Sequence, residues 1–321
     1  MNLQACDQSS VSLNSCISQS SYWLPDVMTA SGWVEHAPFG FWITGALRPR
    51  SIVELGVHHG FSYFVLCQAV QRLRLDARCF AIDSWVGDEH AGFYGDDVYD
   101  AVCSHNRRYD SFSRLIRSDF SDACGQFADG SIDLLHIDGC HSYEAVRQDF
   151  ESWLPKLSKR GVALFHDTAE HDNGFGVYQV WEKLRGRYPH FEFTHGHGLG
   201  VLGVGDDVPA EVHQLFEASS SVASAQLIRT AYERLGAFVA NAQRLAEQSV
   251  EIGKLTQQVR QLEAVKASYE ASTSWRLTAP LRATARLVKS ANGAVGDLRN
   301  TLNDVASTSG EAPEPVYRSQ R

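Results

Sequence analysis

Short apolar runs alternate with amphipathic stretches through the middle of the chain. Runs rich in Val, Ile, Leu and Phe predict buried strands, whereas apolar residues at every third or fourth position predict helices. The expected strands cover residues 51–55, 78–83, 114–117, 132–138 and 161–167, and the expected helices cover residues 62–74, 97–108, 120–127, 142–154 and 177–187. Strands that alternate with helices in this way predict a mostly parallel sheet with helices on both faces.

The last two apolar runs of this region, residues 191–195 and 198–204, have no helix between them. Neighbouring strands that are joined by a short loop pair in antiparallel fashion. The expected fold class is therefore α/β, with a Rossmann-like sheet that is mostly parallel and ends in a C-terminal antiparallel hairpin. We place this domain at residues 51–206. Before it, polar, Ser-rich residues 1–24 predict a flexible arm, and residues 25–50 supply aromatic side chains for one or two covering helices.

Residues 207–270 show no strand pattern and are expected to form a helical extension. Its apolar residues recur at intervals of three and four, as in a coiled-coil seam. The phase shifts between Leu245 and Ile252, which fits one helix with a stutter or two shorter helices. The helix either packs on the domain or joins copies of the chain into a homo-oligomer. The two apolar groups are Ile228, Tyr232, Leu235, Val239 and Ala242, and then Ile252, Leu255, Val259 and Leu262.

A basic segment follows at residues 271–296, which contain no Asp or Glu. Its basic residues are Arg276, Arg282, Arg286 and Lys289, and they stand beside Trp275 and Leu281. This composition predicts contact with an anionic membrane surface or with an acidic partner, and a solvated cationic helix is the alternative. Residues 297–321 contain Gly, Ser and Pro and are expected to be disordered.

The formal net charge of −9 argues against a nucleic-acid-binding surface, because such a surface needs clustered Lys and Arg. A small-molecule or glycan substrate is therefore expected. The seven cysteines show no C-x-x-C spacing, and the first ten residues lack the basic and apolar regions of a signal peptide. These features favour a cytoplasmic protein, at the inner face of the membrane if the basic segment binds lipid.

A glycine loop, ELGVHHGFS at residues 54–62, falls where the first expected strand ends and the first helix begins. An open α/β sheet binds its ligand at this place. Gly56 and Gly60 would let the backbone approach a cofactor closely, because no Cβ stands in the way. The G-x-G-x-x-G fingerprint of nicotinamide cofactors is absent, whereas E-x-G-x-x-x-G-x-S matches the loop under the methionine half of S-adenosylmethionine.

Polar residues at the ends of the next two strands extend this cofactor site. Asp83 ends the second strand, where a carboxylate can accept hydrogen bonds from both ribose hydroxyls, and a turn or helix-cap role is the alternative. Ser118 and Asp119 follow the third strand and can reach an adenine edge, with an N-cap role as the alternative.

Carboxylates and imidazoles follow the fourth and fifth strands. Asp138 and His141 come after residues 132–137, and His166 and Asp167 end residues 161–167. Neighbouring parallel strands place such residues side by side, so the two carboxylates can converge on one hard cation such as Mg²⁺. The alternative is that both Asp residues cap helices and that the histidines are structural.

Taken together, these residues resemble the class I S-adenosylmethionine-dependent methyltransferases, in particular the bacterial branch called methyltransferase family 24. The resemblance covers residues 52–205, with ELGVHHGFS, residues 81–99, residues 132–168 and HGHGLGVLGVG as its signature. It implies that Glu54, Gly56 and Asp83 contact the cofactor. In similar catechol-type enzymes, magnesium ligands stand at the positions of Asp138, Asp167 and Thr168, and a base stands at the position of His141. Here Thr168 replaces an asparagine and His141 a lysine.

The expected function is therefore methyl transfer from S-adenosylmethionine to a hydroxyl of a sugar or glycan intermediate, with Mg²⁺ as a second cofactor. The sugar is favoured by the acidic and aromatic loop at residues 85–94, which could close as a lid, and by SWRLTAPLR at residues 274–282. This tail resembles segments of bacterial glycosyltransferases and their partners in polysaccharide synthesis. Methylation of a small natural product and a non-catalytic cofactor-binding scaffold are the alternatives. The candidate catalytic residues are His141 and His166; the candidate metal ligands are Asp138, Asp167 and Thr168; the candidate cofactor contacts are Glu54, Gly56, Gly60, Ser62, Asp83, Ser118, Asp119 and Asp138.

Overall fold

The computed structural model describes residues 13–88, 92–172 and 174–291. It divides the chain into two compact units, Met1–Ala246 and Glu247–Arg321. The start of the predicted arm, the centre of the predicted lid loop and the predicted disordered tail lie outside the described residues.

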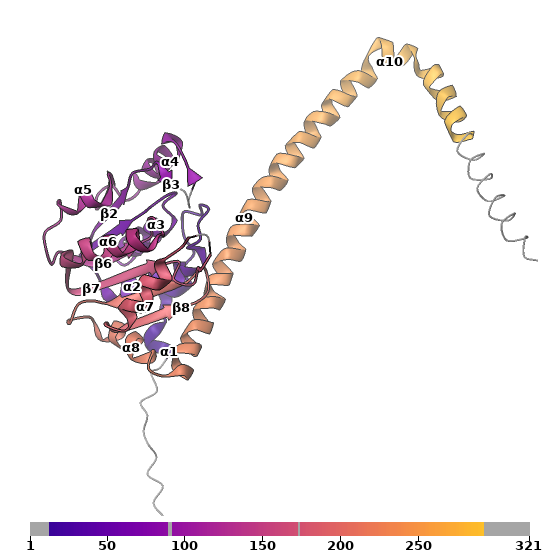
Figure 1. The fold of residues 1–321 in the computed structure, drawn as a ribbon. Helices are drawn as coiled ribbons and strands as arrows, with labels where there is room; N and C mark the ends of the chain where they lie inside the picture. Colours follow the sequence, from indigo (N-terminus) through magenta and orange to yellow (C-terminus); the bar gives the residue numbers. More distant parts are fainter. Residues whose placement is uncertain (1–12, 89–91, 173, 292–321) are drawn as a thin grey trace, which may run out of the picture. The chain divides into compact units, whose positions relative to one another are not determined.

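A seven-stranded sheet forms the centre of the first unit, in the order β5-β2-β1-β6-β7-β9-β8 (Figure 1). The first five strands of this order run parallel, whereas β9 pairs antiparallel with both β7 and β8. The Rossmann-like sheet with a C-terminal antiparallel hairpin is thus confirmed. The strands are β1 (Ser51–Leu55), β2 (Arg78–Asp83), β5 (Ser113–Arg117), β6 (Ile132–Ile137), β7 (Leu157–His166), β8 (His190–Phe193) and β9 (Leu199–Gly203).

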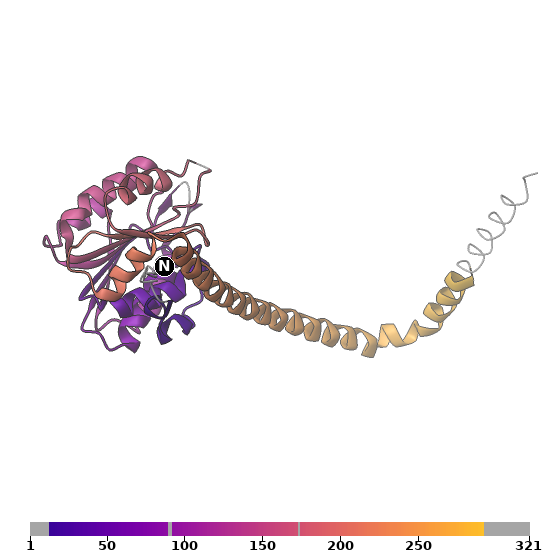
Figure 2. The ribbon, with the colours of Figure 1, turned by 90° about the horizontal axis from the view of Figure 1, so that it is seen from below.

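Helices cover both faces of this sheet, as the view in Figure 2 shows. Side chains alternate along each strand, so Ile52 packs with the helices on one face and Val53 with those on the other. One face carries α2 (Ala37–Leu47), α3 (Phe61–Arg72), α4 (Asp96–Asn106), α8 (Ala210–Ala218) and the start of α9 (Val222–Ala271). The other face carries α5 (Phe120–Cys124), α6 (Tyr143–Trp153) and α7 (Val177–Arg185).

The remaining elements are short. They are α1 (Leu13–Cys16), η1 (Gln19–Tyr22), η2 (Val34–His36), η3 (Leu154–Lys156), the β3 (Gly87–Asp88) and β4 (Gly92–Phe93) hairpin, and α10 (Thr273–Leu277). The prediction of a flexible arm over residues 1–24 is wrong for the part that the structure describes, residues 13–24. Cys16 and Ser21 are buried there, and Cys16 O accepts a hydrogen bond from Tyr232 Oη at 2.6 Å.

The domain boundary expected at residue 206 lies too early, because the first unit continues to Ala246. Ile228, Tyr232 and Val239 in α9 are buried in the same core as α2 and α3. The first apolar group therefore packs on the domain, which was one of the two open interpretations. Both groups belong to one continuous helix rather than two. None of the helices in the described part of the chain is long and apolar enough to cross a membrane.

Candidate active site

The five parallel strands all bring polar residues to their carboxyl ends. The strand order reverses between β1 and β6. From there the chain continues into α3 on one face of the sheet and into α6 on the other, and α/β sheets bind ligands in the cleft at such a place. Gly56 N–H donates to Ile82 O at 3.0 Å, and Asp138 N–H donates to Leu55 O at 2.8 Å. The loops after β1 and β6 are thus fixed to the strands beside them.

Gly56 is required by the protein itself as well as by the expected cofactor. Its φ is +84°, and a Cβ at this position would lie 2.0 Å from the carbonyl oxygen of Asp138. The glycine lets the loop after β1 touch the end of β6. This contact within the protein adds a second reason for glycine to the expected approach of a cofactor.

Asp83 holds the glycine loop in shape. Its Oδ2 accepts hydrogen bonds from the backbone N–H groups of Val57 and His58, at 2.7 and 3.0 Å, and its Oδ1 accepts one from Trp85 N–H at 2.6 Å. Asp83 also lines a cavity beside this loop, which we call the first cavity. Asp83 thus has the structural role that was its alternative, and its contact with a cofactor stays a prediction.

Glu54 lies beneath the loop and is fully buried. Ser62 Oγ donates to Glu54 Oε1 at 2.8 Å, and His136 Nδ1 lies 2.9 Å from Glu54 Oε2. Burial raises the pKa of Glu54, although the hydrogen bonds from His136 and Ser62 oppose the shift. Glu54 and Gly60 are not among the described residues that line the two cavities beside this loop, and their contact with a cofactor stays a prediction.

The first cavity has a volume of about 210 Å³ and runs along the ends of β1, β2, β5 and β6. It contains five of the predicted cofactor contacts: Gly56, Asp83, Ser118, Asp119 and Asp138. Asp119 stands at the N-cap of α5, but its side chain makes no capping hydrogen bond. Its carboxylate therefore lines the cavity without serving the cap that was its alternative role.

The β3–β4 hairpin borders the first cavity. Gly87 and Tyr94 line it, and the Tyr94 ring stacks on His58 with centroids 4.8 Å apart. Trp85 is fully buried, and its Nε1–H donates to His58 O at 3.1 Å. Trp85, the first residue of the predicted lid loop, is thus fixed in the core.

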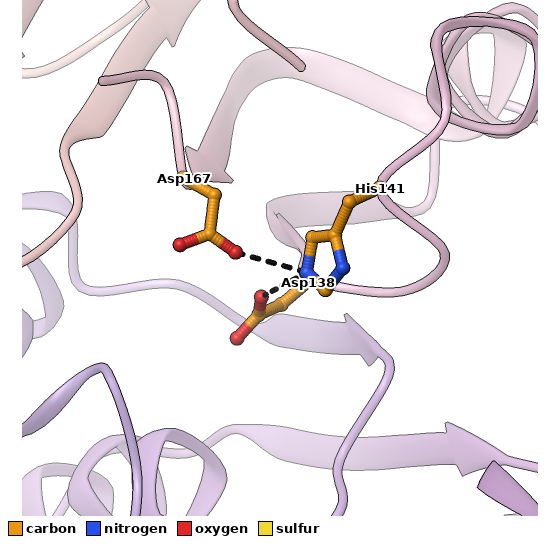
Figure 3. Close-up of side chains that lie close together, drawn as sticks. All are labelled: Asp138, His141 and Asp167. Atoms are coloured by element: carbon orange, nitrogen blue, oxygen red, sulfur yellow. Dashed lines mark ion pairs between the residues drawn. The ribbon is translucent and has the colours of Figure 1, made fainter. Parts of the chain in front are cut away.

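Two aspartates and two histidines meet where β6 and β7 end. Figure 3 shows Asp138 and Asp167 reaching the same nitrogen of His141. His141 Nε2 lies 2.9 Å from Asp167 Oδ2 and 3.6 Å from Asp138 Oδ1. His166 Nδ1 lies 3.2 Å from an oxygen of each carboxylate. The predicted convergence of these four residues is therefore present, and we call them the Asp–His cluster.

The charges of the Asp–His cluster stabilise one another. Burial disfavours the charged imidazoles, but contacts with Asp138 and Asp167 outweigh it and raise the pKa of both His141 and His166 to about 10. Burial likewise opposes ionisation of the carboxylates, but the two histidines hold the pKa of Asp138 and of Asp167 below the usual range. The carboxylates thus favour the charged form of the imidazoles, and the imidazoles favour the charged form of the carboxylates.

The second cavity, of about 320 Å³, lies on the other side of the cluster. Asp138, His141, His166 and Asp167 all line it. Its far wall comes from residues 30–32, and Gly32 is tightly placed, since a Cβ there would lie 3.3 Å from the rings of His166 and His197. The lining contains neither Lys nor Arg among the described residues.

Three residues of the Asp–His cluster are close enough together to hold a divalent cation. Ligand atoms of Asp138, His141 and Asp167 all lie within 4.8 Å of one another, so these three residues could hold a metal ion. Thr168 is buried, lines neither cavity, and its Oγ1 has no hydrogen-bond partner among the described residues. The role of Thr168 as a metal ligand therefore stays a prediction.

Several residues of the site are missed by the sequence patterns. The Phe175 ring stacks on His141 with centroids 4.5 Å apart, and Gly176 N–H donates to His141 O at 2.7 Å. Glu170 and His197 form an ion pair at 2.5 Å in the wall of the second cavity. All lie in loops far along the chain from their partners, where no periodicity indicates contact.

Residues 53–168 match the model of methyltransferase family 24, which is described as a methyltransferase domain. This part of the chain is thus similar to a methyltransferase domain. The resemblance noted in the sequence is thereby confirmed.

The chain is also similar to individual proteins. The uncharacterized protein y4gI of Sinorhizobium fredii is 51% identical over 196 residues, which cover 61% of this chain and 21% of that protein. The chain thus spans about a fifth of that relative's length. Among solved structures, a methyltransferase from Geobacter sulfurreducens has a TM-score of 0.41 and 17% identity, covering 53% of this chain and 78% of its own. The O-methyltransferase TomG from Streptomyces achromogenes, solved with S-adenosylmethionine, has a TM-score of 0.42 and 15% identity, covering 63% and 92%.

Proposed function

We propose that this chain is an S-adenosylmethionine-dependent O-methyltransferase that acts on a hydroxyl group of a sugar or glycan. The observation that carries the proposal is that two cavities meet at the Asp–His cluster. Gly56, Val57, His58, Asp138 and His141 line both of them. We assign the methyl donor to the first cavity, beside the glycine loop, and the acceptor to the second.

This arrangement suits an in-line displacement. The acceptor oxygen forms a bond to the methyl carbon while the carbon–sulfur bond breaks and its electron pair stays on sulfur. Alignment of the two substrates across the residues shared by both cavities supplies much of the rate. The hydroxyl proton must leave during the reaction, and it needs an acceptor on the side of the second cavity.

His141 is our candidate for that acceptor, because it lines both cavities. In the structure its contacts with two carboxylates favour the charged form. The positive charge of a bound sulfonium acts in the opposite direction, since like charge lowers the pKa of an imidazole. Once Nε2 has taken the proton, Asp167 stabilises the imidazolium through the contact at 2.9 Å.

Asp138 and Asp167 are the residues that would hold Mg²⁺, since hard cations prefer oxygen ligands. A bound divalent cation would lower the pKa of the acceptor hydroxyl. A sugar acceptor is supported by the second cavity, which combines the ring faces of Phe61 and Phe175 with carboxylates and imidazoles and lacks a cationic clamp for phosphate among its described residues.

The donor site is tested by titration calorimetry with S-adenosylmethionine and its demethylated product. Asp119→Ala should weaken donor binding about tenfold if it removes one charged hydrogen bond. Asp122→Ala is the matched control, because Asp122 lies in the first turn of the same helix but outside both cavities. Absence of donor binding by the unmodified chain would overturn the proposal.

The acceptor is tested with methyl-labelled donor and a panel of neutral sugars, oligosaccharides and phenols. His141→Ala should lower the rate by about 10²–10⁴ with donor affinity retained, whereas His171→Ala, on an exposed position near the site, should not. EDTA should suppress turnover and Mg²⁺ restore it. Labelling of phenols alone would exclude sugars, and donor binding without any labelled product would favour the scaffold role.

A further inference from the structure

The basic segment forms a second helix after α10. Thr273–Leu277 is helical, Thr278 is a turn, and residues 279–291 are helical again. At 3.6 residues per turn, Arg282, Arg286 and Lys289 lie on one face of this helix. Leu281 and Val288, two turns apart, lie together on a neighbouring face. The helix therefore presents an apolar strip with a basic strip alongside it.

The apolar strip is exposed. Leu281 is 70% exposed and Val288 is 60% exposed. In α10, before the turn, the Trp275 side chain is 41% exposed and the Leu277 side chain is 75% exposed. A helix of this length has little stability alone in water, and exposed apolar groups of this size indicate a surface that is covered when the helix is in use.

The charge of the segment is opposite to that of the rest of the chain. Residues 271–291 carry four basic and no acidic side chains, so the remaining chain has a formal charge of −13 within a total of −9. Arg282 also stacks over the Trp275 ring at 3.7 Å, which leaves its charge beside the apolar strip. A surface that covers this segment should therefore be negatively charged and apolar beneath the charge.

We propose that residues 275–289 bind the surface of an anionic lipid bilayer, with the helix of residues 279–291 lying in the headgroup plane. The strip of Leu281 and Val288 enters the acyl boundary, and Arg282, Arg286 and Lys289 meet the phosphates. Tryptophan is favoured at this depth because its ring is apolar and its N–H is polar. The bilayer fits better than an acidic protein, since a bilayer supplies both charge and an apolar layer along the whole helix.

The proposal is tested by flotation of the full chain with vesicles of phosphatidylcholine alone or with added phosphatidylglycerol. Binding should require phosphatidylglycerol and should fall as salt is raised, because salt screens surface charges. Each basic residue near an anionic surface contributes about fivefold in binding, so the triple variant Arg282→Gln, Arg286→Gln and Lys289→Gln should bind about a hundredfold more weakly.

A second triple variant is the matched control. Lys254→Gln, Arg260→Gln and Lys266→Gln remove the same charge from exposed positions in α9 and should change vesicle binding less than about twofold. Leu281→Ser with Val288→Ser keeps every charge but removes the apolar strip, and it too should weaken binding. Helical content by circular dichroism should stay unchanged in the last two variants, whose side chains are exposed. It is measured for the first triple variant as well, because Arg282 is half-buried and donates to Trp275 O.

Three results would overturn the proposal. The chain could fail to bind anionic vesicles, bind neutral vesicles equally well, or lose as much binding in the control triple variant as in the test variant. Self-association through residues 275–289 in the absence of lipid, detected by sedimentation and abolished by Leu281→Ser with Val288→Ser, would assign the strip to a second copy of the chain instead.

Discussion

The two parts of α9 carry the same spacing of apolar residues but meet different surroundings. In residues 222–246, Ile228, Tyr232 and Val239 are each about 1% exposed. In residues 247–271, Leu255 and Leu262 are 51% and 69% exposed. Periodicity thus indicates which face of a helix is apolar, whereas the surface that covers that face depends on what the rest of the chain places beside it.

The glycines of α9 show the same contrast. A Cβ on Gly236 would lie 2.3 Å from Glu35 O, whereas a Cβ on Gly253 would meet no atom within 4 Å. The first part of the helix touches the backbone of η2. It also holds the segment that leads to the second cavity, since Gln243 Nε2 donates to Thr29 O at 3.0 Å.

Truncation should give the largest difference between the two parts. A chain ending at Ala246 should keep its melting temperature and donor binding. A chain ending at Val208 should lose several kcal/mol, because the core then loses the buried side chains of α8 and α9. Thermal unfolding and calorimetry measure both. Equal stability of the two truncated chains would return the domain boundary to about residue 206.

A single side chain should reproduce much of this effect. Tyr232→Ala should lower the free energy of unfolding by about 3–5 kcal/mol, since its ring packs on Phe39 and Phe193. Tyr232→Phe isolates the hydroxyl that donates to Cys16 O. Leu262→Ala, at an exposed position, should change the stability of the first unit by less than about 0.5 kcal/mol. Similar losses for Tyr232→Ala and Leu262→Ala in urea unfolding would contradict the comparison.

Substitution of the two glycines by alanine should give smaller effects on stability, and the two effects should have opposite signs. Gly236→Ala should destabilise the first unit by about 1–3 kcal/mol, because the helix must move away from Glu35. Gly253→Ala should stabilise α9 by about 0.5–1 kcal/mol, because alanine loses less backbone entropy in a helix. Chemical denaturation followed by circular dichroism tests both changes. Stabilisation by both variants would show that α9 does not approach Glu35 so closely.

The last effect should be electrostatic and confined to the first unit. Burial raises the pKa of Asp149 in α6 from 3.8 to about 7. The folded state therefore favours the protonated form, and the contribution of Asp149 to stability falls as pH rises from about 4 to above 7. Asp149→Asn should raise the melting temperature at pH 8 but not at pH 4. Glu247→Gln, on an exposed position, is the control and should show no such pH dependence.

The sequence by itself determined the fold and the residues at the strand ends. Alternation of apolar runs and amphipathic stretches depends on local periodicity, so it identified the parallel strands, the final hairpin and most helices. Parallel strands also share one carboxyl edge, which explains why the convergence of Asp138 and Asp167 was predicted correctly.

Only the tertiary structure decided how those residues are used. It assigned Asp83 to the glycine loop, buried Glu54 beneath that loop, kept Thr168 out of the cavity lining and stacked Phe175 on His141. It also packed one part of α9 on the core and left the other exposed. These outcomes depend on contacts between segments far apart in the chain, and such contacts leave no periodic signal in the sequence.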